Sequence, residues 1–336
     1  MRILLTSVGR RSYLVEYFKE AVGESGKVFV SNSSAQSPAF SVADGHTVTP
    51  LIYSDEYIPF LMAYCQENSV NAIVSLFDVD LPILSKNKEK FQEIGVKVVV
   101  SDPETLAVCN DKWNTYQFLK KHNIPVPMTF LSVQEAVNAI AEKKIHYPVI
   151  VKPRWGMGSI SVYQADNEVE LNVFYHKVKR DIRKTYLKYE SAENIDECVL
   201  IQEKLKGQEY GLDVINDLEK NYCTTIVKKK LAMRSGETDC AVTVNDSELV
   251  QLGKKLSMHL QHIGNLDVDV FKSDRCAYVL EMNARFGGGY PFSHQAGVDL
   301  PRQIVKWLEG KETDNILLTA NDDVMSQKDI KLVYIE

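Results

Sequence analysis

The sequence lacks any cysteine or histidine pattern that would indicate disulfides or a metal centre. Its six cysteines form no CxxC pair and lie mostly among apolar residues, as small core residues do. The seven histidines form no cluster, which argues against a zinc site. Free thiols of this kind are typical of a reducing compartment, so we expect a cytoplasmic protein.

The sequence also lacks the marks of several other classes. No apolar run approaches the roughly 20 residues that a membrane span needs. The N-terminus passes from a short apolar run straight into Arg10 and Arg11, which indicates a buried first strand and no signal peptide. A formal charge of -6 gives no support for a nucleic-acid surface. The run Lys228–Lys230 is a local exception, and it is either an anion site or, more commonly, a solvated face.

Two catalytic signatures are absent as well. There is no G-x-S-x-G and no Cys/His arrangement, so covalent acyl chemistry is not indicated. The turn after the first strand holds one glycine, Gly9, and therefore no G-x-G-x-x-G dinucleotide motif. What is present must point to the function instead.

The length of 336 residues predicts two or three domains. In the first hundred residues, short apolar runs alternate with helical patterns, which predicts a parallel sheet covered by helices. The predicted strands are 3–6, 28–30, 72–76 and 96–100, and the predicted helices are 12–21, 58–67 and 81–91. Further on, Asp111 and Ser132 have the sequence context of helix caps. The highly charged stretch 177–197 is expected to be an exposed excursion. Later strands are expected at 199–201, 210–215 and 222–227, and a helix at 249–260.

Two distant segments carry the chemistry. In the first, residues 148–159, an apolar strand ends at Lys152 and leads into a loop containing Gly156, Gly158 and Ser159. Glycines let backbone N–H groups approach phosphate oxygens closely, and a lysine beside them adds positive charge. Either feature alone is weak, because turns are rich in glycine and a lysine often simply emerges at the end of a strand.

In the second segment, residues 278–289, an apolar strand ends in Glu281, Asn283 and Arg285. Residues two apart on a strand point to the same side, so Glu281 and Asn283 can reach one ion. The preceding strand offers Asp267 and Asp269 in the same alternation. These oxygen donors suit Mg²⁺. The alternative is a salt-bridged network with Arg285. Together, the two segments predict an enzyme that binds a nucleoside triphosphate with magnesium.

Two further carboxylates, Glu203 and Glu209, lie at a strand end and six residues beyond it. They could accept hydrogen bonds from ribose hydroxyls. On these residues alone, a surface pair is the better interpretation.

The order of these parts resembles that of ATP-grasp enzymes, and in particular the carbamoyl phosphate synthase large-subunit group and its stand-alone amino-acid ligase relatives. The resemblance covers nearly the whole chain. It implies that Lys112 and Lys152 are phosphate-binding residues, that Glu203, Lys204 and Leu205 form the hinge meeting adenine, and that Glu209 binds ribose. Glu281 and Asn283 match the metal ligands and Arg285 the arginine that follows them. The third ligand is Asp269 or Asp267; alignment favours Asp269 and leaves Asp267 open. The segment with Arg234, Glu237 and Asp239 resembles the one that faces the acceptor substrate.

The resemblance implies an ATP-grasp fold of mixed α/β and α+β class with an N-terminal Rossmann-like domain. The expected parts are a pre-ATP-grasp domain over 1–104, a central lid over 105–197 with the glycine-rich loop, and a C-terminal part over 198–336 with the metal strand. The implied catalytic residues are Arg285 and Lys152, and the implied cofactors are ATP and Mg²⁺, with Mn²⁺ as a substitute.

The implied reaction activates a carboxylate as an acyl phosphate and joins it to an amine, one of these substrates being amino-acid-like because the acceptor segment carries charges of both signs. Partners are therefore small carboxylates and amines, with no nucleic acid or membrane, and a homodimer is an expectation. One alternative is a half-synthase that phosphorylates bicarbonate or carbamate, although the synthase subunit is a fused double unit and this chain holds one unit. Another is a nucleotide-binding module without turnover.

Overall fold

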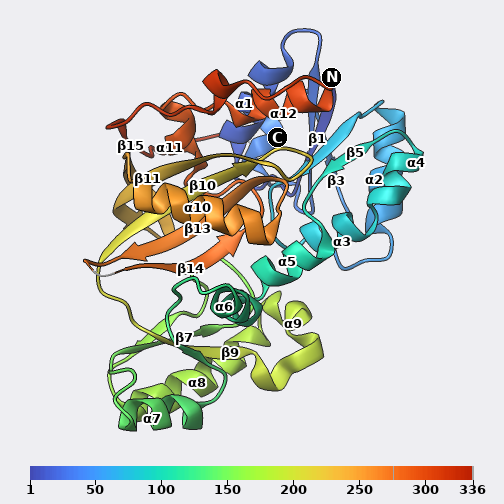
Figure 1. Ribbon diagram of the computed structural model, residues 1–336. Coiled ribbons are helices and arrows are strands. Elements are labelled where there is room, and N and C mark those ends of the chain that lie inside the picture. Colours follow the sequence, from blue (N-terminus) through green and yellow to red (C-terminus); the bar gives the residue numbers. More distant parts are fainter. Residues whose placement is uncertain (275, 335–336) are drawn as a thin grey trace.

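The computed structural model describes residues 1–274 and 276–334. The N-terminal part is a five-stranded parallel sheet in the order β3-β2-β1-β4-β5 (Figure 1). Its strands are β1 (Arg2–Thr6), β2 (Lys27–Asn32), β3 (Gly45–Val48), β4 (Ala72–Ser75) and β5 (Lys97–Val99). Its helices are α1 (Ser12–Val22), α2 (Tyr57–Glu67), α3 (Leu81–Lys86) and α4 (Lys88–Glu93), with the short turn η1 (Pro38–Val42). This strand order is that of a Rossmann-like sheet, so the predicted fold class is confirmed for this part.

Two details of the N-terminal part differ from the sequence prediction. The helix expected over 81–91 is two helices separated at Asn87. The edge strand β3 was not predicted, because its side chains alternate between half-buried and exposed and give no continuous apolar run.

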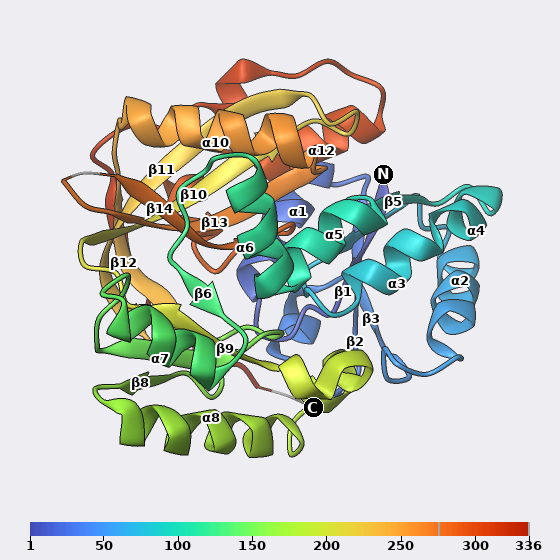
Figure 2. The ribbon, with the colours of Figure 1, turned by 60° about the horizontal axis from the view of Figure 1, so that its bottom comes forward.

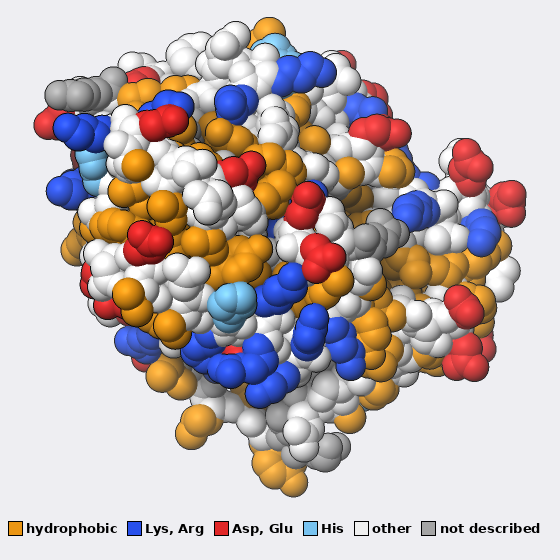
Figure 3. All heavy atoms as spheres, turned by 90° about the horizontal axis from the view of Figure 1, so that it is seen from below, with side chains coloured by type: hydrophobic (Ala, Val, Ile, Leu, Met, Phe, Trp, Pro, Cys, Tyr) orange, Lys and Arg blue, Asp and Glu red, His pale blue; other side chains and the backbone are white. Residues whose placement is uncertain are grey.

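The middle of the chain forms a small antiparallel sheet in the order β6-β9-β7-β8. Its strands are β6 (Thr129–Phe130), β7 (Val149–Pro153), β8 (Tyr163–Ala165) and β9 (Val199–Glu203), and its helices are α7 (Val133–Ala141) and α8 (Glu168–Ile182), followed by α9 (Leu187–Glu190) and η2 (Ala192–Glu197). We call residues 129–203 the lid. Ser132 makes the predicted capping box with Glu135. Figure 3 views the molecule from the lid side, where Lys and Arg side chains gather in one band.

The third part is a six-stranded antiparallel sheet in the order β14-β13-β10-β11-β12-β15. Its strands are β10 (Gln208–Asn216), β11 (Tyr222–Arg234), β12 (Glu237–Thr243), β13 (Gly264–Lys272), β14 (Ala277–Asn283) and β15 (Met325–Gln327). The helix α10 (Ser247–Leu260) covers one face. The remaining helices are α5 (Pro103–Asn110), α6 (Lys112–Lys121), α11 (Tyr290–Gln295), α12 (Leu300–Leu308) and η3 (Asn315–Leu318). The helix α6 lies between this large sheet and the lid (Figures 1 and 2).

The large sheet has two chemically different faces. One face is apolar, with Leu212, Val268 and Val270 fully buried beside the leucines of α10. On the opposite face, the same strands carry charged side chains, because successive residues of a strand point to opposite sides. That charged face is turned toward the lid, and the candidate site lies there.

Three apolar cores hold these parts together. Two of them mix residues of the N-terminal sheet with residues of the large sheet, as when Leu4 and Ile73 share a cluster with Leu212 and Val268. The third consists of lid residues with a few flanking side chains. The stretch 177–197, expected to be exposed, contributes Ile182 and Leu187 to this third core, so that expectation was wrong for part of its length. None of the described helices is long and apolar enough to cross a membrane.

Candidate functional site

The start of α6 places Lys112 at the junction of the lid and the large sheet. Asp111 caps the helix by accepting from the backbone N–H of Trp113, and the same carboxylate receives two hydrogen bonds from Arg154 at 2.7 and 2.8 Å. This double use ties α6 to β7 of the lid. The Lys112 ammonium then donates to the Gly156 carbonyl and lies 3.4 Å from the Glu281 carboxylate. Lys112 therefore joins the glycine-rich loop to the predicted metal strand.

Lys152 occupies the lid side of the same junction. It ends β7, and its ammonium donates to Gln202 Oε1 at 2.8 Å on the neighbouring strand. No carboxylate pairs with it in the described part of the chain. Burial therefore lowers its pKa to about 8, helped by Lys112 and opposed by Glu281. A half-buried lysine without a directly paired carboxylate is unusual, and such sites are commonly functional.

The glycine-rich loop has a backbone that few other residues could adopt. Gly156 has φ of +99°, and a Cβ at that position would lie 2.4 Å from Leu187 Cδ2. Gly158 and Ser159 also have positive φ values. The loop is thus shaped by glycine and held against the lid core, with Gly158 and Ser159 lining the cleft above the charged face of the sheet.

Four residues with side-chain oxygens stand on that face in two cross-strand pairs. On paired strands, Asp269 stands opposite Glu281 and Asp267 opposite Asn283. Burial alone would raise the pKa of Glu281, but the charges of Lys112, Lys152 and Arg285 outweigh it and lower that pKa. Glu281 is therefore held as a carboxylate in the middle of three cations.

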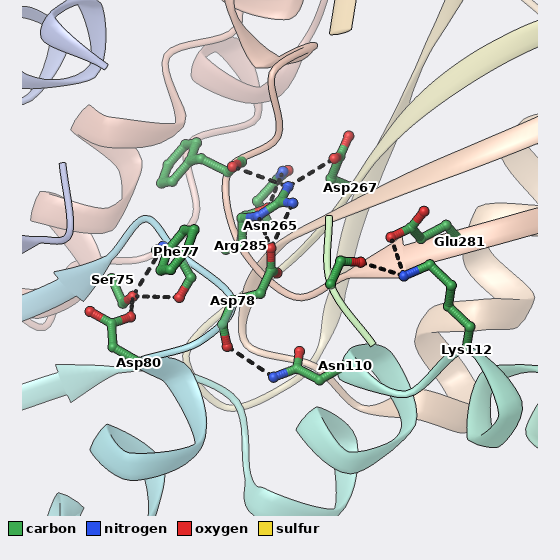
Figure 4. Close-up of polar contacts among 12 residues, drawn as sticks. Ser75, Phe77, Asp78, Asp80, Asn110, Lys112, Asn265, Asp267, Glu281 and Arg285 are labelled. Carbon is green, nitrogen blue, oxygen red and sulfur yellow. Dashed lines mark hydrogen bonds and ion pairs between the residues drawn. The ribbon is translucent and has the colours of Figure 1, made fainter. Parts of the chain in front are cut away.

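Arg285 clamps two acids from different parts of the fold (Figure 4). Its guanidinium donates to Asp78 Oδ2 at 2.9 and 3.1 Å and to Asp267 Oδ2 at 2.9 Å. Burial, with the nearby Asp269 and Asp213 charges, raises the pKa of Asp267 to about 6 although Arg285 opposes this. Both candidates for the third metal ligand are engaged, Asp267 with Arg285 and Asp269 with Lys230. Asp269 stands opposite Glu281 in the strand register, and we keep its assignment as a proposal.

Two lysines of the site were not assigned from the sequence. Lys228 and Lys230 are buried on the charged face, whereas Lys229 points to the other side. The Lys230 ammonium lies 2.6 Å from both Glu209 and Asp269, and Lys228 pairs with Asp213. Burial alone would lower the pKa of Lys230, but its two carboxylate partners raise it. The solvated-face interpretation of this run is therefore wrong for Lys228 and Lys230.

Several predicted residues lie away from this centre. Glu203 accepts from the backbone N–H of Met128 at 3.2 Å, and Lys204 donates to Gln164 at 2.5 Å. Neither residue lines the cleft, and Leu205 does not line it either. These three remain the proposed adenine hinge, now placed at the edge between the lid and β10.

The predicted acceptor segment is the β11–β12 hairpin. Arg234 is 57% exposed and pairs with the buried Asp239 at 3.3 Å, so the two charges neutralise each other. Glu237 lines the cleft and pairs with Lys328 at 3.1 Å. Of the three predicted substrate residues, Glu237 therefore faces the site, while Arg234 does not line the cleft and Asp239 does not either.

Similarity to known proteins identifies the family of the chain. The family model described as "ATP-grasp domain" matches residues 109–289, more than half of the chain. The chain belongs to the ATP-grasp family. A second model, described as "PylC-like, N-terminal domain", matches residues 3–99. The predicted ATP-grasp fold is confirmed.

Relatives of this ATP-grasp chain include the carbamoyl phosphate synthase large chain of Clostridium acetobutylicum, 24% identical over 303 residues. That match covers 87% of this chain but 27% of the relative, so the chain spans about a quarter of its length. Among solved structures, the L-amino acid ligase of Bacillus licheniformis superposes with a TM-score of 0.71 at 17% identity, covering 93% of this chain and 77% of that one.

A third similar structure is the biotin carboxylase domain of the Hydrogenobacter thermophilus 2-oxoglutarate carboxylase. Its TM-score is 0.71 at 16% identity, covering 93% of this chain and 70% of that one. It was solved with ADP, its magnesium salt and bicarbonate. At these identities, the structures show a shared fold.

The side chains proposed as metal ligands offer oxygen donors, which are the donors that magnesium prefers. Asp269, Glu281 and Asn283 supply two carboxylates and an amide, all oxygen donors. No three His, Cys, Asp or Glu side chains within residues 1–274 and 276–334 are grouped so as to hold a metal by themselves. Such a sparse set suits Mg²⁺, which keeps several waters and is shared with substrate phosphates.

The lowered pKa of Lys152 predicts how nucleotide affinity depends on pH. Below pH 8 the side chain is mostly charged, and above it the side chain is mostly neutral in the free protein. A bound phosphate favours the charged form, so binding above pH 8 must take up a proton. We expect the Kd for MgADP, measured by calorimetry, to rise from pH 7 to pH 9.5. Above pH 8, the binding enthalpy should also change with the ionisation enthalpy of the buffer, because binding takes up a proton. A pH-independent Kd would contradict the assignment of Lys152 to phosphate.

Proposed function

We propose that this chain is an ATP-dependent ligase that activates a carboxylate as an acyl phosphate and joins it to an amine. One observation carries the proposal. Glu281 and Arg285, at and just after the end of β14, line the cleft, and the charges of Lys112 from α6, Lys152 from the lid and Arg285 all act on the Glu281 carboxylate. This combination of buried cations and oxygen donors suits phosphoryl transfer, where charge neutralisation provides most of the catalysis.

In this proposal, the nucleotide lies between the lid and the charged face of the large sheet. Lys112, Lys152 and the loop 156–159 face its phosphates, while Glu209 receives the ribose and residues 203–205 the adenine. Asp269, Glu281 and Asn283 would hold Mg²⁺, or Mn²⁺ in its place. When bound, the metal supplies positive charge that neutralises the phosphate oxygens. ADP and magnesium in the solved biotin carboxylase domain support this placement.

The proposed chemistry has two steps. A carboxylate oxygen of the first substrate attacks the γ-phosphorus, and ADP leaves. The amine of the second substrate then attacks the acyl carbon, phosphate leaves, and the amine loses a proton. Arg285 and Lys152 stabilise the negative charge on the transferred group, and the closed lid keeps water from the acyl phosphate. No protein nucleophile is needed.

The similarity to an L-amino acid ligase supports an amino-acid-like substrate, and the hairpin with Arg234, Glu237 and Asp239 is its proposed neighbour. The similarity to the carbamoyl phosphate synthase large chain supports a second candidate, phosphorylation of bicarbonate or carbamate. We place the reaction in the cytoplasm with small-molecule partners. A homodimer also stays a proposal; the H. thermophilus biotin carboxylase domain was solved as a dimer.

The test is a screen for ADP release. Purified protein with MgATP is first incubated with pairs of pools, each pair made of one pool of carboxylates and one pool of amines. It is then incubated with bicarbonate alone. Pair-dependent ADP release, with the ligated product seen by mass spectrometry, supports the ligase. Release with bicarbonate alone supports the second candidate. If the protein binds nucleotide but releases no ADP under any of these conditions, the alternative of a non-catalytic nucleotide-binding module is favoured.

Glu281→Gln is expected to change the dependence on metal. The substitution keeps the size of the side chain but removes the charge that faces Asp269 across the strand pair. We expect the Mg²⁺ concentration giving half-maximal ADP release to rise by about tenfold or more, since a metal ligand lost or weakened costs on that order. Binding of ADP without Mg²⁺ should change little. An unaltered Mg²⁺ titration would remove Glu281 from the metal site.

A further inference from the structure

Arg11 is a cleft residue whose charge is unused. It lies on the turn after β1 and lines the same cleft as Glu237, Asp267 and Arg285. Among the described residues, its guanidinium has no hydrogen-bond or ion-pair partner, whereas Arg285 and Arg154 each have two acidic partners. Arginine offers five donors in a rigid fork that matches a carboxylate. An unpaired, half-buried arginine at a ligand cleft is therefore available for a ligand.

The turn that carries Arg11 is fixed in place. Ser7 donates to Asp80 at 2.7 Å, and Ser37 donates to the Gly9 carbonyl at 2.7 Å. The backbone of Arg11 begins α1, yet its side chain makes no capping hydrogen bond. Ser, Thr, Asp and Asn are the favoured residues at such a position, so a local rule is broken here. Residues that break local rules inside a fixed frame are commonly functional.

The surroundings of Arg11 carry an excess of positive charge. Glu237 is the acid at this end of the cleft, and it already pairs with Lys328. Burial alone would raise the pKa of Glu237, but Lys328, Arg11 and Arg10 together lower it. Three cations around one carboxylate leave room for a second anion. Arg11 also lines the cleft together with Arg285 and Asp267.

Glycines 287–289 bring backbone close to the cleft. Gly287 packs so closely that a Cβ there would lie 2.1 Å from the Asp267 carboxylate carbon. Gly288 and Gly289 follow, and both line the cleft, beside Lys328 and Lys228 respectively. Gly288, Gly289, Arg11 and Arg285 all line this one cleft, so a single ligand there can meet both arginines.

We propose that Arg11 binds the carboxylate of the amine substrate, which is therefore an amino acid and not a simple amine. This carboxylate is not the one that is phosphorylated; it holds the amino acid while its amine points toward Arg285 and the acyl phosphate. The charge of Arg234 is neutralised by Asp239, so Arg234 is not available for a substrate carboxylate. Arg11 has no such partner among the described residues and can take that role. The inference rests on the proposed ligase function and names the class of one of its substrates.

The test compares amino acids with their amides, which lack the carboxylate. In ADP-release assays with the wild type, we expect amino acids to have a KM about 10–100-fold lower than the matching amides, because a charge-assisted pair contributes on that order. Arg11→Ala should raise the KM for the amino acid by the same factor, abolish the preference over the amide and leave the KM for ATP unchanged. Arg11→Lys should recover part of the affinity. Arg180→Ala removes the same charge from an exposed position on α8, away from the cleft, and should behave as the wild type.

Calorimetric titration of the wild type and Arg11→Ala with the same amino acids and amides, in the presence of MgADP, gives a readout that does not need turnover. Amino-acid binding that is lost in Arg11→Ala supports the proposal even if no carboxylate substrate has been found. The proposal is overturned if amino acids and amides bind equally, if neither binds, or if Arg11→Ala binds as the wild type. The ligase function would survive those results if a simple amine stimulates ADP release, and it would fail separately if no pair of substrates does.

Discussion

Arg285→Ala is expected to give the largest loss of stability of any single substitution in the site. The guanidinium is buried between Asp78 and Asp267, and burial already raises the pKa of Asp267 to about 6. Removing the cation leaves two carboxylates in a buried position without compensation. Losing one partner of a buried ion pair costs about 3–5 kcal/mol. We expect the free energy of unfolding at pH 7, measured by urea denaturation, to fall by this amount.

Two variants test the cause of that loss. Adding Asp267→Asn to Arg285→Ala removes one of the uncompensated charges and should restore part of the stability, a coupling that a double-mutant cycle measures. Lys311→Ala breaks an exposed ion pair with Glu309 and should change stability by less than about 1 kcal/mol. If Arg285→Ala unfolds at the same urea concentration as the wild type, the clamp does not stabilise the fold.

Lys152→Ala is expected to give the largest loss of turnover without loss of fold. Lys152 is half-buried, has an amide and no carboxylate as its hydrogen-bond partner, and has a pKa lowered to about 8. Removing it should leave the stability nearly unchanged, because its ammonium makes one hydrogen bond to an amide and no ion pair among the described residues. By contrast, losing one preorganised contact to the transferred phosphate costs about 10²-fold in rate. The measurement is kcat for substrate-stimulated ADP release, together with thermal unfolding of the same preparation.

The lid offers a matched control for this variant. Lys144 is an exposed lysine of the lid that pairs with Glu142, so Lys144→Ala removes the same charge from the same subdomain. Its turnover should equal that of the wild type. A folded Lys152→Ala protein with wild-type kcat would exclude a role in phosphoryl transfer.

The parts of the fold that sequence reasoning predicted well are those with a strong local signal. Apart from the edge strand β3, the strands of the N-terminal sheet lie in continuous apolar runs, which few other elements produce. Glu281 and Asn283 lie two residues apart at the end of an apolar strand. This spacing alone predicts that their side chains point to the same face of the sheet.

The residues that were missed depend on distant partners. The sequence prediction ended a strand at Val227, because three lysines follow, whereas β11 continues to Arg234. Lys228 and Lys230 can remain in the strand because Asp213, Glu209 and Asp269 neutralise them from the neighbouring strands. Similarly, Asp78 meets Arg285 across more than two hundred residues of sequence. Whether a run of like charges is buried or exposed therefore cannot be predicted until the positions of the opposite charges are known.

The three-part division predicted from the sequence stays a proposal, and the apolar cores indicate where its lid begins and ends. The helices α5 and α6 share a core with the large sheet, and β9 pairs with β6 and β7. We therefore propose that the moving part is the lid over 129–203, with its boundaries later than the predicted 105 and 197.

The distribution of the apolar cores divides the site into a fixed and a movable half. Lys112, Glu281 and Arg11 all belong to the frame in which the N-terminal sheet and the large sheet share their cores, whereas Lys152 and the glycine-rich loop belong to the part built around its own core. A unit with a separate core can turn as a rigid body about its connections. We therefore propose that nucleotide enters and leaves by displacement of that unit alone, while Glu281, Asn283 and Arg11 keep their mutual distances.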